Sequence, residues 1–226
     1  MLDFLRDIAP NLVKKQGEFV GAIGQTLYMM AVSGGISFLI GMALGILLTV
    51  CKPGGIRPNR VIFTVLDRLI NVLRSIPFII LLTAVIPLTR LISGSAIGTA
   101  GAIVPLVFGT VPFFTRQIET ALAEVDSGLV EAAQAMGMSP WAIIWRVLLR
   151  ESIPGIVRGS MITIVSLVGL TAMAGAVGGG GLGDFAIRYG HQRNQVDITW
   201  ATVLTLLVLV SLIQAVGRRI VKRTTH

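Results

Sequence analysis

The stretch from Glu131 to Ile156 reads EAAQAMGMSPWAIIWRVLLRESIPGI, and it lies between two long segments that contain few charged residues. It carries four charged side chains, at Glu131, Arg146, Arg150 and Glu151. A chain built mainly from apolar segments has no packing reason to place such a stretch in its interior. We therefore expect this stretch to lie outside the apolar phase and to meet a partner.

The same stretch predicts a helical hairpin over residues 127–151. Ser127 is a residue type that caps helix starts, and Gly137 can end a helix in the left-handed conformation. Ser139 and Pro140 are typical of an N-cap followed by the first position of a second helix. The expected order is helix, tight glycine turn, helix.

Composition places the whole chain in the membrane class. The chain has 226 residues, of which 54% are hydrophobic and 13% are charged, whereas soluble domains carry about a quarter charged residues. This length allows one integral membrane domain without an appended soluble enzyme. Cys51 is the single cysteine, so the sequence excludes an intrachain disulfide.

Five apolar runs predict an all-α integral membrane protein with five transmembrane helices, because a span needs about 20 apolar residues. The expected spans are residues 22–50, 69–89, 92–115, 159–178 and 198–217. They form a membrane domain over 20–217, preceded by an interfacial segment at 1–19 and followed by a basic tail at 218–226. Pro77 lies inside the second span, where it should kink the helix, either to line a pathway or only to fit the packing of neighbouring helices.

The distribution of basic residues predicts the orientation. The loop at 52–60 and the tail at 218–226 are strongly basic, and basic loops remain in the cytoplasm. The N-terminus is then expected outside and the C-terminus and the hairpin in the cytoplasm. The net charge of +8 is thus interpreted as membrane orientation and attraction to anionic lipid, without nucleic acid as a partner.

Three interpretations of the hairpin remain open from the residues alone. It can be a plain interfacial connection between two spans, a DNA-reading helix-turn-helix, or a docking element for a cytosolic motor protein. A DNA-reading helix needs polar and basic groups, whereas the second helix here reads WAIIWRVLL. This composition disfavours the DNA interpretation.

The spacing in the hairpin resembles the EAA motif of ATP-binding-cassette (ABC) importer permeases. The matching positions are Glu131, Ala132, Ala133, Gly137, Val147 and Leu149. The resemblance implies a type I importer core whose cytoplasmic coupling helix fits a groove on an ATPase subunit. Glu131 would make a polar contact there, Ala132 and Ala133 a close contact, and Gly137, Ser139 and Pro140 the turn. Arg150 stands where the family motif usually has proline.

Three further segments resemble the methionine-importer permease subfamily: 74–82 (RSIPFIILL), 102–106 (AIVPL) and 175–183 (GAVGGGGLG). The resemblance implies a homodimer in a bacterial inner membrane, with two ABC ATPase subunits that bind ATP and Mg²⁺. It also implies an external substrate-binding lipoprotein and methionine, including its D-isomer, as the substrate. No cofactor or metal is expected in this chain.

The fourth span offers candidates for a gate. Ser166, Gly169 or Leu170, and Met173 fall on one helical face, and a methionine can close a pore around varied groups. With Pro77, these residues are the candidate pathway; the alternative is that Met173 faces lipid or the protein core.

Other classes of function are also considered. The sequence lacks a nucleotide-binding P-loop and the common hydrolase motifs, so we expect a permease and not an enzyme. An importer for another amino acid or small solute, and a membrane assembly subunit without a pore, remain as alternatives.

Overall fold

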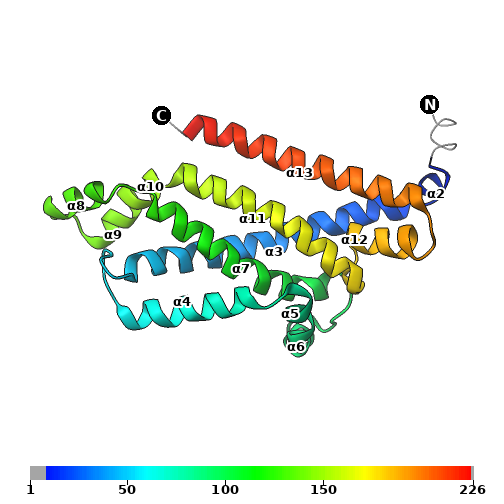
Figure 1. Cartoon of the computed structure of the whole chain (residues 1–226), viewed down its shortest axis with the longest axis horizontal. Coiled ribbons are helices and arrows are strands. Elements are labelled where there is room, and N and C mark those ends of the chain that lie inside the picture. Colours follow the sequence, from blue (N-terminus) through cyan, green and yellow to red (C-terminus); the bar gives the residue numbers. More distant parts are fainter. Residues whose placement is uncertain (1–8, 225–226) are drawn as a thin grey trace. The chain divides into compact units, whose positions relative to one another are not determined.

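The computed structural model describes residues 9–224, and within these residues all regular structure is helical (Figure 1). Residues 1–8 of the expected interfacial segment, and residues 225–226 of the tail, lie outside the described residues. The helices, with η marking π-helical segments, are α2 (Pro10–Lys14), α3 (Gln16–Cys51), α4 (Arg60–Ser75), α5 (Phe78–Ala84), α6 (Ile86–Ser93), α7 (Gly98–Ala123), α8 (Ser127–Ala135), α9 (Pro140–Ile143), η1 (Ile144–Leu148), α10 (Leu149–Glu151), α11 (Ile153–Ala174), η2 (Gly175–Gly179), α12 (Gly181–Phe185), η3 (Ala186–His191) and α13 (Val196–Thr224).

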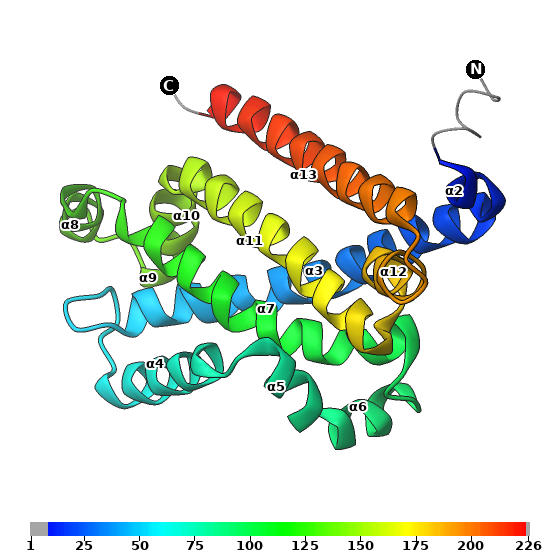
Figure 2. The same cartoon turned by 45° about the vertical axis from the view of Figure 1, so that its right-hand side comes forward.

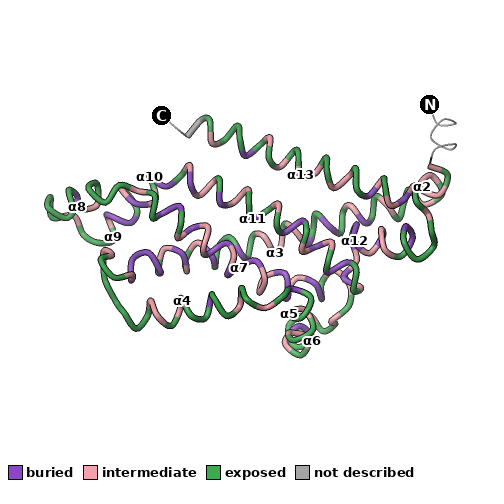
Figure 3. Tube along the Cα trace, viewed as in Figure 1, coloured by how far each residue is buried: buried purple, intermediate pink, exposed green. Residues whose placement is uncertain are grey.

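Four of the five expected spans coincide with helices that are long and apolar enough to cross a membrane. These candidate spans are Gln16–Cys51, Gly98–Ala123, Ile153–Gly179 and Val196–Lys222. In the described residues they are longer than the expected spans, because α3, α7 and α13 continue through polar residues at their ends. Figure 3 shows α13 as mostly exposed or half-buried, and only 11% of its most apolar window is buried. Its apolar side chains therefore require a surrounding apolar phase or a partner.

The single helix predicted over 69–89 is wrong. This segment is divided among α4, α5 and α6, and α4 begins already at Arg60, where the Asn59 side chain accepts hydrogen bonds from two backbone amides. The break falls at Ile76 and Pro77, which adopt extended ψ angles of 122° and 134°. A residue before proline is disfavoured in the helical conformation, and proline supplies no amide hydrogen. The result is a helix break where we expected only a kink.

Helix α4 is amphipathic, which hydropathy counting alone does not show. Its polar residues recur every three or four positions, so they fall within one arc of about 120°. These residues are Arg60, Thr64, Asp67, Arg68, Asn71, Arg74 and Ser75. Exposed apolar side chains, among them Val65, Leu69 and Val72, lie outside this arc.

The segment 184–197 is helical over much of its length. Leu182, Phe185 and Tyr189 recur at helical spacing, and all three are buried in a cluster with Ala22 and Ile198. This spacing of apolar side chains outweighs the glycines and charges around it, because burial of an aromatic side chain contributes about 2 kcal/mol.

The chain forms two compact units, each assembled from several segments. The first comprises the residues up to Gly35, Pro77–Phe108 and Ile164–Ile213, and the second comprises Ile36–Ile76, Gly109–Thr163 and the residues from Gln214 onward.

Polar contacts between helices of the first unit lie beside its aromatic cluster. The Asp197 carboxylate accepts hydrogen bonds from the backbone and side-chain nitrogens of Asn11, at 2.9 and 3.1 Å. The Tyr189 hydroxyl donates to Glu18. Gln25 Oε1 accepts from the backbone amide of Gly181 at 2.8 Å, so side chains of α3 satisfy the start of α12.

Glycines form the helix contacts of the second unit. A Cβ added at Gly41 or Gly45 of α3 would lie 2.8 or 2.6 Å from Phe114 or Ile118 of α7. Glycines at this four-residue spacing let two membrane helices approach closely. Gly155 and Gly159 of α11 make a second contact of the same kind on α7, against the side chains of Ala121 and Gln117.

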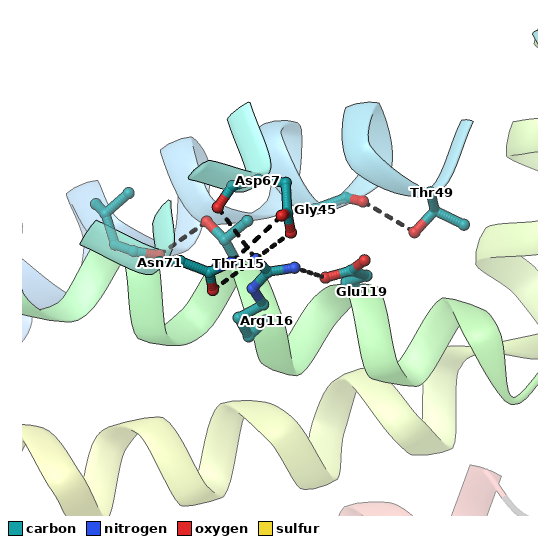
Figure 4. A network of polar contacts seen from close by, with 8 residues as sticks. Gly45, Thr49, Asp67, Asn71, Thr115, Arg116 and Glu119 are labelled. Atoms are coloured by element: carbon teal, nitrogen blue, oxygen red, sulfur yellow. Dashed lines mark hydrogen bonds and ion pairs between the residues drawn. The ribbon is translucent and has the colours of Figure 1, made fainter. Parts of the chain in front are cut away.

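An ionic network joins α4 to α7 within the second unit. In Figure 4 the Arg116 guanidinium points at Asp67 and Asn71 of α4 and at Glu119 one turn along α7. Its distances to Asn71 Oδ1 and Glu119 Oε2 are 2.9 and 2.6 Å. Two residues of the polar arc of α4, Asp67 and Asn71, thus contact α7.

Candidate functional site

The N-cap of α8, the first helix of the hairpin, lies one residue earlier in the chain than expected. Asp126, and not Ser127, is the N-cap residue, because its Oδ1 accepts a hydrogen bond from the Gly128 amide at 2.8 Å. Ser127 is the first helical residue. A carboxylate at this position also interacts favourably with the positive end of the helix dipole, which explains why aspartate takes the cap in preference to serine.

The turn has the predicted left-handed glycine. Gly137 has φ of +77°, its amide donates to Gln134 O at 2.9 Å, and the Met138 amide donates to Ala133 O at 3.1 Å. This pair of bonds is the Schellman arrangement that ends a helix. Nothing lies within 4 Å of a Cβ added at Gly137, so the requirement for glycine comes from the backbone conformation alone.

The second helix starts as predicted and then continues as a π-helical segment, which has a wider turn. Ser139 Oγ accepts from the Ala142 amide at 3.3 Å, and Pro140 is the first helical residue of α9. The helix continues through η1 to α10, ending at Glu151. Leu148 and Leu149 pack against buried side chains of α7. The inner face of the hairpin is thereby anchored on α7, and Figures 1 and 2 show α8, α9 and α10 gathered where α7 ends and α11 begins.

The residues of the EAA-like spacing divide into exposed and buried positions. Glu131 and Ala132 are exposed, whereas Ala133 is only 1% exposed and accepts the turn hydrogen bond from Met138 through its carbonyl oxygen. Ala133 therefore packs inside the hairpin and presents no surface to a partner, in contrast to the expectation. Leu149 is half-buried and serves the anchor on α7.

Several apolar side chains of the hairpin are exposed. Leu129 and Met136 are exposed on α8 and at its C-cap, and Trp141 is 69% exposed on α9. Their exposure could not be inferred, because a helical stripe shows which residues share a face and not whether that face is covered.

The expected pathway residues lie in the first unit. Ser166, Gly169 and Met173 are exposed along α11, and Leu170 is half-buried. Pro77 is exposed and is the N-cap residue of α5. The three residues of α11 do share an exposed face, and their role as a gate stays a prediction.

The glycine-rich end of α11 departs from helical geometry. Gly178, Gly180 and Gly181 have positive φ angles, and the chain turns there from η2 into α12. A run of four glycines at 178–181 does not favour a regular helix. Among residues 9–224, no group of three or more His, Cys, Asp or Glu side chains could hold a metal ion.

Apolar helices of spanning length, together with an exposed hairpin between two of them, define a multi-span membrane protein. Residues 37–226 match the model of the family described as "binding-protein-dependent transport system inner membrane component". The chain belongs to this family, and it has the type I ABC importer permease fold.

Relatives with known names support the same assignment. The chain is 50% identical over 205 residues to the "probable D-methionine transport system permease protein MetI" of Vibrio cholerae, covering 91% of each chain. It is 47% identical over 156 residues to the "D-methionine transport system permease protein MetI" of Escherichia coli K12, covering 69% of this chain and 72% of that one.

A solved structure has the same fold. A chain of the MetNI methionine ABC transporter, determined in inward-facing conformations, superposes with a TM-score of 0.92 at 44% identity. The match covers 94% of this chain and 99% of that chain.

Proposed function

We propose that this chain is the membrane-spanning permease subunit of an ATP-driven importer for methionine, including its D-isomer. The observation that carries the proposal is the hairpin over 127–151, with its Schellman turn at Gly137 and its exposed face at Glu131 and Ala132. The substrate is supported by the names of the V. cholerae and E. coli relatives and by the methionine transporter of the same fold.

The proposed partners follow from the hairpin and from the relatives. Two copies of an ABC ATPase bind ATP and Mg²⁺ and hydrolyse ATP, and each docks on the hairpin of one of two copies of this chain. An external substrate-binding lipoprotein delivers the substrate. This chain itself needs no cofactor for the transport step.

The connections of the hairpin provide the mechanical link. Helix α7 leads into α8 through only three residues, and α10 leads into α11 across Ser152. Leu148 and Leu149 also tie the second helix to α7. A displacement of the hairpin by the ATPase is thus passed to two spans together, as rigid-body alternating access requires.

The proposed orientation places the hairpin and the C-terminus in the cytoplasm and the N-terminus outside the inner membrane. The basic residues of the 52–60 loop and the basic tail support it, because both lie on the same side if the segment α4–α6 crosses the membrane. Lipid surrounds the exposed apolar side chains of α13.

Ser166, Gly169, Met173 and Pro77 are proposed to line the pathway. Single cysteines at 166, 169 and 173, in a chain with Cys51→Ser, should react with a soluble thiol reagent at rates that change when the ATPase binds ATP. Equal protection at all three positions under both conditions would remove them from the pathway.

Uptake into vesicles tests the whole proposal. The chain is co-purified with its ATPase, reconstituted, and supplied with ATP and a panel of amino acids, with the binding lipoprotein on the opposite side. We expect uptake of L- and D-methionine and lower uptake of other amino acids. Uptake of a different amino acid in preference to methionine would identify another substrate, and ATPase association without uptake of any amino acid would indicate an assembly subunit.

A further inference from the structure

The second unit contains an apolar groove that the proposed transport mechanism does not use. The groove has a volume of about 1000 Å³ and lies between α3, the start of α4 and the helix α9–η1. One wall consists of α3 side chains at positions 39, 42, 43, 46, 47 and 50. These positions recur at intervals of three and four residues, so they form one continuous stripe along the helix.

The length of this stripe corresponds to one leaflet of a bilayer. From Leu39 to Val50 the helix rises by about 17 Å, at 1.5 Å per residue. Half of a hydrocarbon core of about 30 Å is about 15 Å. An extended acyl chain of a membrane lipid would therefore be covered along its length by this wall.

One end of the groove is basic. Arg57, Pro58 and Asn59 line the groove beyond the end of α3, and from Lys52 to Leu66 the sequence has three basic residues and no acidic one. Arg57 is exposed, and it forms no ion pair or side-chain hydrogen bond within residues 9–224. A guanidinium of this kind can bind a phosphate through two nitrogens.

Two tryptophans form the opposite wall. Trp141 and Trp145 line the groove, both are exposed, and their rings lie edge to face with centroids 5.7 Å apart. Tryptophan is enriched where the apolar core of a membrane meets the head groups. The groove is thus apolar along one helix, cationic at one end and bordered by side chains typical of the membrane interface.

We propose that this groove binds one anionic phospholipid, with its acyl chains along α3 and its phosphate at Arg57. The bound lipid contacts α3, the start of α4 and the second helix of the hairpin together. It therefore stabilises the position of the hairpin relative to α3 and α4. The proposal concerns binding and does not depend on the substrate of transport.

Tryptophan fluorescence tests the proposal directly. The chain has three tryptophans, and Trp200 lies on α13, outside the groove. In the full chain with Trp200→Phe, the remaining emission comes from Trp141 and Trp145. The protein is placed in nanodiscs of phosphatidylcholine with a small, increasing fraction of brominated phosphatidylglycerol, and in a parallel series with brominated phosphatidylcholine.

We expect brominated phosphatidylglycerol to quench at several-fold lower mole fraction than brominated phosphatidylcholine, and to saturate. Arg57→Gln should make the two lipids equal, whereas Arg68→Gln, which removes a charge of α4 outside the groove, should preserve the difference. Ala43→Phe, which fills the groove beside α3, should reduce quenching by the anionic lipid. Phosphatidylglycerol should also raise the Tm of the starting protein more than that of Arg57→Gln.

Three outcomes would overturn the proposal. Equal quenching by both lipids in the starting protein would show ordinary contact with the bilayer. A preference for the anionic lipid that persists in Arg57→Gln would place the phosphate elsewhere. Absence of quenching by either lipid would show that protein, such as a second copy of the chain, covers the groove. None of these outcomes depends on methionine uptake, so failure here and failure of the proposed function are separable.

Discussion

Gly137 illustrates a residue whose identity is fixed by one backbone angle. Its φ of +77° costs other residues about 1–2 kcal/mol, and the open space around it excludes a steric contribution. A change at this position therefore perturbs the turn without perturbing the packing of its neighbours.

We expect Gly137→Val to lower ATP-driven uptake by about ten-fold or more while the protein still inserts and dimerises. A β-branched residue disfavours the left-handed conformation strongly, so the Schellman turn opens and the exposed face of α8 is displaced. Gly137→Asn is the matched control, because asparagine tolerates this conformation, and it should retain most uptake. Equal activity of the two variants in reconstituted vesicles would contradict the role given to the turn.

Arg116 provides a second test at the residue scale. Its side chain is 17% exposed and binds Asp67, Asn71 and Glu119. Arg116→Met leaves two carboxylates without their cation, so we expect a loss of about 2–3 kcal/mol, measured as a lower Tm in detergent. Arg158→Met is the control: Arg158 is 50% exposed in its pair with Glu124, and the loss should stay below about 1 kcal/mol. Similar losses for both variants would mean that the network does not hold α4 on α7.

At the scale of elements, the contacts of α7 depend on small residues from two neighbouring helices. Gly41 and Gly45 approach it from α3, and Gly155 and Gly159 approach it from α11. Helices in a membrane gain little from excluding lipid, so close contact between backbones supplies the attraction.

We expect Gly45→Ala to destabilise the second unit by about 1–3 kcal/mol, because the added Cβ would lie 2.6 Å from Ile118 and overpacking costs this much. Gly35→Ala, on the same helix with nothing within 4 Å, should be neutral or stabilising by about 0.5–1 kcal/mol through helix preference. Thermal unfolding of both variants measures the difference. A loss in Gly35→Ala as large as that in Gly45→Ala would indicate a general intolerance of α3 and not a specific contact.

The segment from Arg60 to Ser93 shows why element boundaries were harder to predict than element types. The uncharged run 75–89, extended to Leu69 for length, suggested one span over 69–89, but the structure divides this segment among three helices. Hydropathy averages over a window and cannot register that Pro77 has no amide hydrogen to donate, or that Asp67 and Asn71 of α4 bind Arg116 of α7. Both facts are lost in a window average.

At the scale of the whole molecule, the orientation in the membrane is a consequence of charge distribution. A C-terminal green fluorescent protein fusion should fluoresce in cells, and a C-terminal alkaline phosphatase fusion should be inactive, because we expect the tail in the cytoplasm. The same two reporters inserted after Gly54, in the basic 52–60 loop, should give the same pattern. An active phosphatase at either position would reverse the proposed orientation or change the number of crossings.

The sequence alone determined the membrane class, four of the apolar helices, the hairpin with its left-handed Gly137, and the resemblance to ABC importer permeases. These features depend on local composition, helical spacing and backbone preferences, which act within a few residues of the chain. The tertiary structure decided the helices in 184–197, the burial of Ala133 and the groove beside Trp141. Each of these depends on which side chains from distant segments cover a face, and that covering is a property of the folded chain only.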